Sequence, residues 1–344
     1  MSSSSGVPVK RVDRTIWLWG LLYFAAYTPY AGLVKAMSAG RLPGLAGIDG
    51  LQLLPSVLTG TLITLPIYVL FLGWWRYAHV PSRAVILSGF GTSLIIATTT
   101  LAYCFHGISV LFALLLLRGG MLIIAPITDL IGRRRVRWFS SVALIISLSA
   151  VGLGIIATNN HQLSLAAIIN LAVYLLGYQI RLPQMTKYAK VDEPETTRVY
   201  FVGEIMVTLF FLALIPLAGA ALDVESLRRG LTLVVSGSTT ANVGFLIGIL
   251  YATLYVFTTF IYLDRRENTF CMAMNCCSSL LAGIAASYGL SRILGMPTPQ
   301  WFELAGVGMI MIALMFLSPL HHIPEWMFAA AVQRLPFGSI RKGS

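Results

Sequence analysis

Ionisable residues inside an apolar stretch are the first candidates for chemistry in this sequence. The segment "RGGMLIIAPITDLIGRRRVRW" begins with Arg118 and carries Asp129 near its middle. The arginines that follow are Arg133, Arg134, Arg135 and Arg137. A charge at the centre of a bilayer costs about 2.5–3.5 kcal/mol, so it needs a partner or a task. Arg118 is therefore expected either to contact substrate or to have a structural role, tying helices together or reaching the outer headgroups, and these alternatives stay open.

Two carboxylates are candidates for coupling or gating. Asp129 lies eleven residues after Arg118, about 16 Å along a helix, so the two cannot pair directly. Asp129 stands four residues before Arg133, and an ion pair at the cytoplasmic edge is its favoured reading. Glu204 follows the start of another apolar run. It could serve as a gate or proton-binding group, since transporters use intramembrane carboxylates as proton relays. The alternative is an interfacial residue paired with Arg198 or Lys190.

Tyrosines at helical spacing form two stripes, 23–30 and 174–178, that combine aromatic surface with hydroxyl groups. Such stripes more often pack or lie at the membrane interface, and for Lys35 an outer interfacial lysine is the favoured interpretation. The candidate substrate-binding residues are Arg118, Lys35, Tyr27, Tyr30, Tyr174, Tyr178, Arg181, Asn170 and Asn275. The basic members favour a substrate with a carboxylate or phosphate group.

The elements that position these residues follow from the composition. The chain has 344 residues, of which 57% are hydrophobic and 11% charged, against about 25% charged in soluble domains. Because a helical crossing needs about 20 apolar residues, we expect an all-α membrane protein with ten transmembrane helices. Their ranges are 15–35, 51–75, 84–104, 109–131, 139–157, 163–181, 199–220, 241–263, 270–293 and 301–318. Residues 221–240 are expected to hold an interfacial helix or to extend the eighth span.

The basic residues predict the orientation. With the N-terminus inside, the outer side carries only Lys35, Arg41, Arg228, Arg229 and Arg292, whereas eighteen lysines and arginines fall on the cytoplasmic side. This asymmetry indicates a multi-pass protein of the cell (inner) membrane with both termini cytoplasmic. It also explains the net charge of +11 without nucleic acid.

The sequence suggests an internal repeat. A shift of about 148 residues brings "RGGMLIIAPIT" over "RENTFCMAMNC", with Arg118 over Arg266, and "YTPYAGLVKA" near "VYLLGYQIRL". An odd number of helices per half would invert the second half relative to the first. The expected divisions are a cytoplasmic tail at 1–14, five-helix repeats at 15–158 and 159–319, and a cytoplasmic amphipathic tail at 320–344.

Each expected half closes with a similar segment, "RVRWFSSVALIISLSAVGLGI" and "PTPQWFELAGVGMIMIAL". These segments, and ten short helices in a 5+5 arrangement, resemble the EamA-like group of the drug/metabolite transporter superfamily. The resemblance implies a permease fold with a central cavity onto which Lys35 would open. Pro126 matches the proline of the family's fourth helix, but Met274 stands at its counterpart in the ninth, and Asp129 lies earlier than the family's acidic residue.

The sequence shows no Walker loop and no G-x-S-x-G, H-E-x-x-H or paired-carboxylate motif, so we predict neither an enzyme nor a cofactor or metal site. The predicted function is secondary transport of a small polar metabolite, with anionic character favoured, by alternating access driven by a proton or ion gradient. The alternatives are a flippase for a lipid or lipid-linked headgroup and a scaffold without transport. The expected partners are the small-molecule or lipid substrate and membrane lipids, with no nucleic acid, and a homodimer remains open.

Overall fold

The computed structural model describes residues 15–317, except 106, 132–137, 158–163, 190–192 and 265–267. This part of the chain is helical and contains no strand, which confirms the predicted all-α class. The helices are α1 (Thr15–Ser38), α2 (Gly50–Phe71), η1 (Trp74–Tyr77), α3 (Arg83–Cys104), α4 (Val110–Ile131), α5 (Trp138–Ala157), α6 (Leu165–Tyr188), α7 (Pro194–Ala221), α8 (Glu225–Val235), α9 (Thr239–Tyr262), α10 (Asn268–Leu294) and α11 (Trp301–Leu317). The predicted tails at 1–14 and 320–344 lie outside the described residues.

Polar N-cap residues begin four of the long helices. Asp49, Ser82, Ser164 and Ser238 precede α2, α3, α6 and α9, and each side chain accepts a hydrogen bond from a backbone N–H of the first turn. Those N–H groups have no partner inside the helix, so a short polar side chain stabilises the start. Local chemistry therefore determines where these apolar segments become helical.

Ten helices of the described chain coincide with the ten predicted segments, with changes at their ends. α2 stops at Phe71 and a separate 3₁₀ turn follows, whereas α6 continues to Tyr188, beyond the predicted end at 181. Residues 221–240 contain the separate helix α8 rather than an extension of α9. α8 packs on α2, α7 and α9.

No single shift of about 148 residues brings the starts of all the helices of the two expected halves into register. α1 and α6 begin 150 positions apart, but α4 and α10 begin 158 positions apart. A constant shift of about 148 places Arg118 on Arg266, which precedes the first residue of α10. The change of register follows α8, an additional helix between α7 and α9.

The surface and the helix lengths have the character of a multi-pass membrane protein. Within the described residues, six helices are long and apolar enough to cross a bilayer: α2, α3, α6, α7, α9 and α10. Shorter apolar helices occur at Val110–Leu122, Leu144–Ile155 and Trp301–Met315. Large apolar side chains such as Leu21 and Phe210 are well exposed, as expected where lipid is the solvent. The total of ten crossings stays a prediction.

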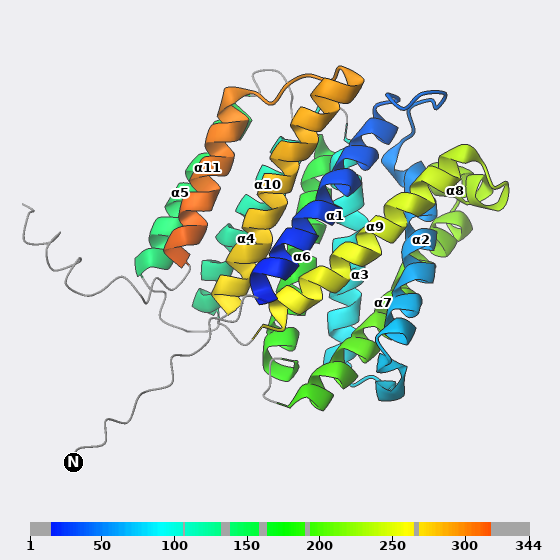
Figure 1. Ribbon diagram of the computed structural model, residues 1–344, viewed down its shortest axis with the longest axis horizontal. Helices are drawn as coiled ribbons and strands as arrows, with labels where there is room; N and C mark the ends of the chain where they lie inside the picture. Colours follow the sequence, from blue (N-terminus) through cyan, green and yellow to red (C-terminus); the bar gives the residue numbers. More distant parts are fainter. Residues whose placement is uncertain are drawn as a thin grey trace, which may run out of the picture.

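Figure 1 shows α5 and α11 side by side at one edge of the molecule and α2, α7 and α8 at the other. α1 and α10 cross the middle, with α3, α4, α6 and α9 around them. α1 packs on α9 and α10, whereas α6 packs on α3 and α4. These six helices carry the candidate site.

α1 and α6 run in opposite directions, as their contacts with α3 demonstrate. Lys35, in the last turn of α1, donates to the Phe105 carbonyl just after α3, so α1 and α3 finish together. In contrast, Gly177 late in α6 faces Gly91 early in α3, while Asn170 early in α6 bonds to α3 near its end. We call the two ends of the bundle the Lys35 end and the Arg181 end.

Glycines permit the closest helix contacts. A Cβ atom on Gly91 would lie 2.7 Å from the Gly177 carbonyl oxygen, and one on Gly177 would lie 2.8 Å from that of Gly91. A Cβ on Gly248 of α9 would lie 2.2 Å from a carbonyl oxygen of α2. Larger residues at these positions would push the helices apart, because small residues let membrane helices approach closely.

Candidate functional site: a buried arginine among tyrosines

Arg118 lies inside the molecule, in the middle of α4. Only 3% of its surface is exposed, so it does not extend to the headgroups. The following residues let neighbouring helices come close: a Cβ on Gly119 would lie 2.6 Å from Val151 of α5, and one on Gly120 would lie 3.0 Å from Leu175 of α6. The glycine pair therefore encloses the arginine, and the snorkelling alternative is wrong.

The Arg118 guanidinium binds tyrosine hydroxyls from two different helices. Nη1 donates to Tyr174 Oη at 3.0 Å, and Nη2 donates to Tyr23 Oη at 3.1 Å. Nη1 also approaches the Met121 sulfur at 3.5 Å. The buried Nε has no hydrogen-bond partner, and no described carboxylate forms an ion pair with this arginine.

These contacts leave the positive charge and the Nε–H donor uncompensated by the described residues. An arginine offers five N–H donors and stays charged under all ordinary conditions. Neutral hydroxyls orient the guanidinium but do not balance its charge, and buried charges are normally paired. A small anion would supply both the negative charge and the missing acceptor.

The predicted tyrosine stripes meet around this arginine. In α1 the rings of Tyr23 and Tyr27 lie 5.3 Å apart, and in α6 those of Tyr174 and Tyr178 lie 5.0 Å apart. Arg118 also interacts electrostatically with Tyr27 and Tyr178. The structure thus brings together four of the predicted binding residues, Arg118, Tyr27, Tyr174 and Tyr178, and adds Tyr23.

Two other candidates, Tyr30 and Lys35, lie toward the Lys35 end. Tyr30 Oη is 3.1 Å from Thr100 Oγ1, and Lys35 Nζ donates to the Phe105 carbonyl at 3.0 Å. Lys35 is only 8% exposed, so it is not a solvated interfacial lysine in this conformation. Both residues join α1 to the end of α3.

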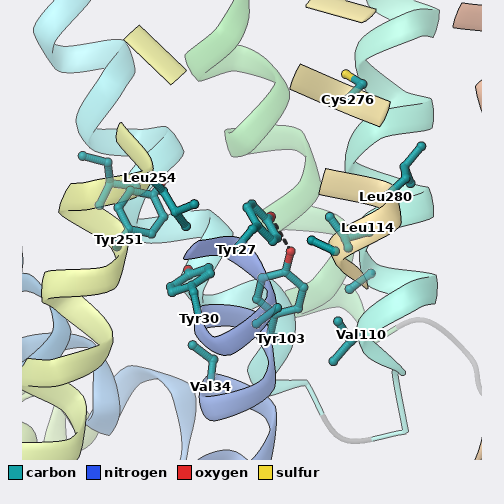
Figure 2. Packing of buried hydrophobic residues seen from close by; sticks show 14 of the residues in the cluster. Tyr27, Tyr30, Val34, Tyr103, Val110, Leu114, Tyr251, Leu254, Cys276 and Leu280 are labelled. Atoms are coloured by element: carbon teal, nitrogen blue, oxygen red, sulfur yellow. Dashed lines mark hydrogen bonds between the residues drawn. The ribbon is translucent and has the colours of Figure 1, made fainter. Parts of the chain in front are cut away.

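A hydrogen-bonded tyrosine pair also connects α1 to α3. Figure 2 shows Tyr27 and Tyr103 pointing toward each other, with their hydroxyl oxygens 2.6 Å apart. Tyr30 packs edge-on against Tyr103 and against Tyr251 of α9. Neutral aromatic residues therefore make most of the contact between α1 and α3 toward the Lys35 end.

Toward the Arg181 end the helices are joined by a buried ion pair. Arg181 Nε donates to Glu204 Oε1 at 2.9 Å, and Nη2 donates to Oε2 at 3.3 Å. Ser88 and Thr92 of α3 donate to Oε1 at 2.6 and 2.9 Å, and Tyr255 of α9 donates to Oε2 at 2.8 Å. Glu204 is fully buried. This network joins α3, α6, α7 and α9, and its charges cancel.

The partner of Glu204 differs from the alternative drawn from the sequence. Arg198 Nη1 donates to Tyr77 Oη at 2.9 Å instead, and its guanidinium lies over that ring. Glu204 faces inward, where it meets Arg181 rather than Arg198. Lys190 and the Asp129 side chain lie outside the described residues.

The two candidate asparagines join helices and retain buried acceptors. Asn170 Nδ2 donates to the Thr98 carbonyl of α3 at 3.0 Å, and Asn275 Nδ2 lies 3.1 Å from Thr258 Oγ1 of α9. Both Oδ1 atoms are buried without a partner. They are hydrogen-bond acceptors that a solute inside the bundle could use.

Sequence reasoning missed Ser88, Thr92, Tyr103, Tyr255 and Tyr262. The sequence did contain a signal for Tyr103 and Tyr262: "TTLAY" at 99–103, near the end of α3, returns as "TTFIY" at 258–262, at the end of α9. The residues that surround Glu204 have ordinary types and no distinctive spacing. Only the packing of four helices brings them together.

Metal chemistry finds no support in the described part of the chain, which has no group of three or more His, Cys, Asp or Glu residues placed to bind an ion. The cysteines Cys104, Cys271, Cys276 and Cys277 form no disulfide. Compared with protein-family models and with curated proteins, the chain matches none.

Proposed function

We propose that this chain is a membrane carrier that binds a small anionic solute at Arg118, between two related halves of five helices each. The observation that carries the proposal is the buried guanidinium, which holds two tyrosine hydroxyls and keeps a free Nε. An ionisable residue inside a membrane-spanning segment is a functional-site candidate by default. Because the site has a single arginine, a small anion that carries one or two charged groups would suit it.

The packing of the helices supports two related halves. If α1, α2, α3, α4 and α5 correspond to α6, α7, α9, α10 and α11, several of the largest helix contacts have counterparts. α1 on α9 corresponds to α6 on α3, α2 on α9 to α7 on α3, and α1 on α10 to α6 on α4. α5 and α11 pack on each other, as equivalent helices on a two-fold axis do.

Equivalent hydrogen bonds support the same correspondence. Thr61 of α2 donates to the Gly248 carbonyl of α9 at 3.2 Å, and Thr208 of α7 donates to the Gly89 carbonyl of α3 at 3.2 Å. Both threonines connect a second helix of one half to a third helix of the other. Exchanged contacts of this kind are expected from an inverted repeat.

The anion site would then lie on the axis that relates the halves. Tyr23 and Tyr27 of α1 stand at the same relative positions as Tyr174 and Tyr178 of α6. Arg118 binds Tyr23 and Tyr174, one residue from each equivalent pair. A site on such an axis can be reached from either end by equal and opposite movements, which is the geometry that alternating access requires.

A soluble solute suits this site better than a lipid. The guanidinium is enclosed by α1, α4 and α6 and is almost completely buried. A lipid headgroup would need an opening beside it for its acyl chains. The flippase alternative therefore becomes an outcome of the test.

The test uses the purified chain in lipid nanodiscs with L-lactate, benzoate and inorganic phosphate as anions and choline as the cation control. An anion at 100 times its Kd stabilises the folded protein by about 2.7 kcal/mol, which raises the thermal unfolding midpoint. We expect at least one anion to do so, choline to have no effect, and Arg118→Gln to abolish the response. Arg292→Gln, at an exposed arginine of α10, is the matched control and should retain it.

Transport is measured in proteoliposomes with the same radiolabelled anions. Exchange of an internal for an external anion that requires Arg118 supports the carrier. Movement of fluorescent phosphatidylserine between leaflets, without anion exchange, would assign the site to a lipid headgroup. If neither activity nor anion stabilisation is observed, the carrier proposal is wrong and a scaffold role gains support.

A further inference from the structure

The two ends of the bundle use equivalent positions but different chemistry. Tyr27 and Tyr30 of α1 stand where Tyr178 and Arg181 stand in α6, because both stripes follow the spacing Y-x-x-x-Y-x-x-(Y/R). Tyr30 binds a threonine hydroxyl of α3, whereas Arg181 binds the carboxylate of Glu204. Each end is thus joined across helices at the same level, once by hydroxyls and once by ions.

The tyrosines that end α3 and α9 differ in the same way. Tyr103 Oη is hydrogen-bonded to Tyr27 at 2.6 Å. Its equivalent, Tyr262, lies within electrostatic range of Tyr178, but its buried hydroxyl has no hydrogen-bond partner. At the Arg181 end, α9 is held by Tyr255 and the Glu204 network instead.

We propose that these contacts are two unlike latches that close alternate ends of the Arg118 site. The hydroxyl latch, Tyr27 with Tyr103, closes the Lys35 end, and the ionic latch, Arg181 with Glu204 and Tyr255, closes the Arg181 end. Both latches are made in the conformation described here, so it corresponds to an occluded carrier. The inference rests on the proposed function, because alternate opening has a purpose only around a central site.

The connection between latch and site runs along α1 and α6. Tyr23, which binds Arg118, precedes Tyr27 of the hydroxyl latch by one helical turn, and Tyr174 precedes Arg181 of the ionic latch by two. A proline follows each of these latch residues within two positions, Pro29 in α1 and Pro183 in α6. Proline removes a backbone hydrogen bond from the helix interior, so each helix can bend near its latch.

The ionic latch is the stronger of the two. It combines a two-point arginine–carboxylate contact with three hydroxyl donors, and hydrogen bonds to charged groups contribute more than neutral ones. The hydroxyl latch is a single neutral contact. Weakening either latch should therefore favour opening at its own end, and alternate opening requires the opposite end to close.

The experiment removes one hydroxyl from each latch and reads the accessibility of both ends. Tyr103→Phe weakens the hydroxyl latch and Tyr255→Phe weakens the ionic latch, with no change of charge or volume beyond one oxygen. Tyr288→Phe, at an exposed tyrosine of α10, is the matched control.

The reporters are Val34→Cys and Met185→Cys, one in each of the two equivalent helices. Both positions are buried and lie one turn beyond Tyr30 and Arg181, toward the Lys35 end and the Arg181 end respectively. The background carries alanine at the native thiols, Cys104, Cys271, Cys276 and Cys277. The rate of reaction with a water-soluble maleimide is measured in nanodiscs, where both ends face water.

Loss of one neutral hydrogen bond changes a conformational equilibrium by about fivefold. We expect Tyr103→Phe to raise labelling at Val34→Cys by about that factor and to lower it at Met185→Cys. Tyr255→Phe should do the reverse, and Tyr288→Phe should change neither rate. If the hydroxyls had a purely structural role, their loss would raise the labelling rate at both reporter positions.

Any pattern other than opposite changes at the two reporters overturns the latch proposal. Because the labelling needs no substrate, Arg118→Gln in the same background should leave the opposite changes intact. Opposite labelling without stabilisation by any anion would retain the latches and reject the anion site. Anion stabilisation without opposite labelling would retain the anion site and reject the latches.

Discussion

Replacement of Glu204 by glutamine is expected to lower the free energy of unfolding by about 3–5 kcal/mol, the cost of removing one partner from a buried ion pair. The carboxylate receives two N–H groups of Arg181 and three hydroxyl groups, from Ser88, Thr92 and Tyr255. Glutamine has nearly the same shape but presents an NH₂ group where an acceptor is needed. Arg181 would then remain buried without a balancing charge.

The loss can be measured by reversible unfolding with sodium dodecyl sulfate in mixed micelles, followed by tryptophan fluorescence. The double variant Arg181→Met with Glu204→Leu provides the control. It removes both charges together, and replacing a buried pair by apolar residues is often neutral or stabilising. We expect it to recover most of the loss. A Glu204→Gln penalty below about 1 kcal/mol, or a double variant as unstable as the single one, would refute the reasoning.

Three further outcomes are expected. Gly248→Ala should cost about 1–3 kcal/mol through overpacking, because its Cβ would lie 2.2 Å from a carbonyl oxygen, whereas Gly32→Ala meets nothing within 4 Å and should be neutral or stabilising. Equal losses in thermal unfolding would contradict this. Tyr23→Phe removes one acceptor of the buried guanidinium and should cost about 1.5–3 kcal/mol. An unchanged unfolding midpoint would argue against that hydrogen bond. The hydrogen bond from Arg229 holds the pKa of Glu225 below its ordinary value, so the ion pairs of α8 persist at neutral pH and are lost as the pH falls below the ordinary pKa of a glutamate. Amide exchange in α8 should rise below that pH and, in Glu225→Gln, already at neutral pH.

Much of the helical layout was predictable because it depends on local features. Runs of about 20 apolar residues, interrupted by polar residues such as Asp49 and Ser238, define where helices begin. The boundaries that failed depend on contacts beyond the run itself. α6 continues past Arg181 because that side chain finds a carboxylate in α7, so a charged residue did not end the helix.

The candidate site was predictable only in part. Arg118 was identified because an ion in an apolar run is costly wherever that run is placed. The tyrosine stripes were visible as helical spacing, which fixes the face that Tyr23 and Tyr27 share. Neither argument could separate Tyr27, near Arg118, from Tyr30, which binds α3.

The sequence by itself determined the solvent of this protein, the positions of its long helices and the one arginine whose burial demanded an explanation. These properties follow from composition and short-range periodicity, which act along the chain. Only the tertiary structure decided that Arg181 is neutralised by Glu204 while Arg118 has no carboxylate partner among the described residues. Pairing depends on which faces of separate helices meet, and that is set by close packing between helices, as at Gly91 of α3 and Gly177 of α6.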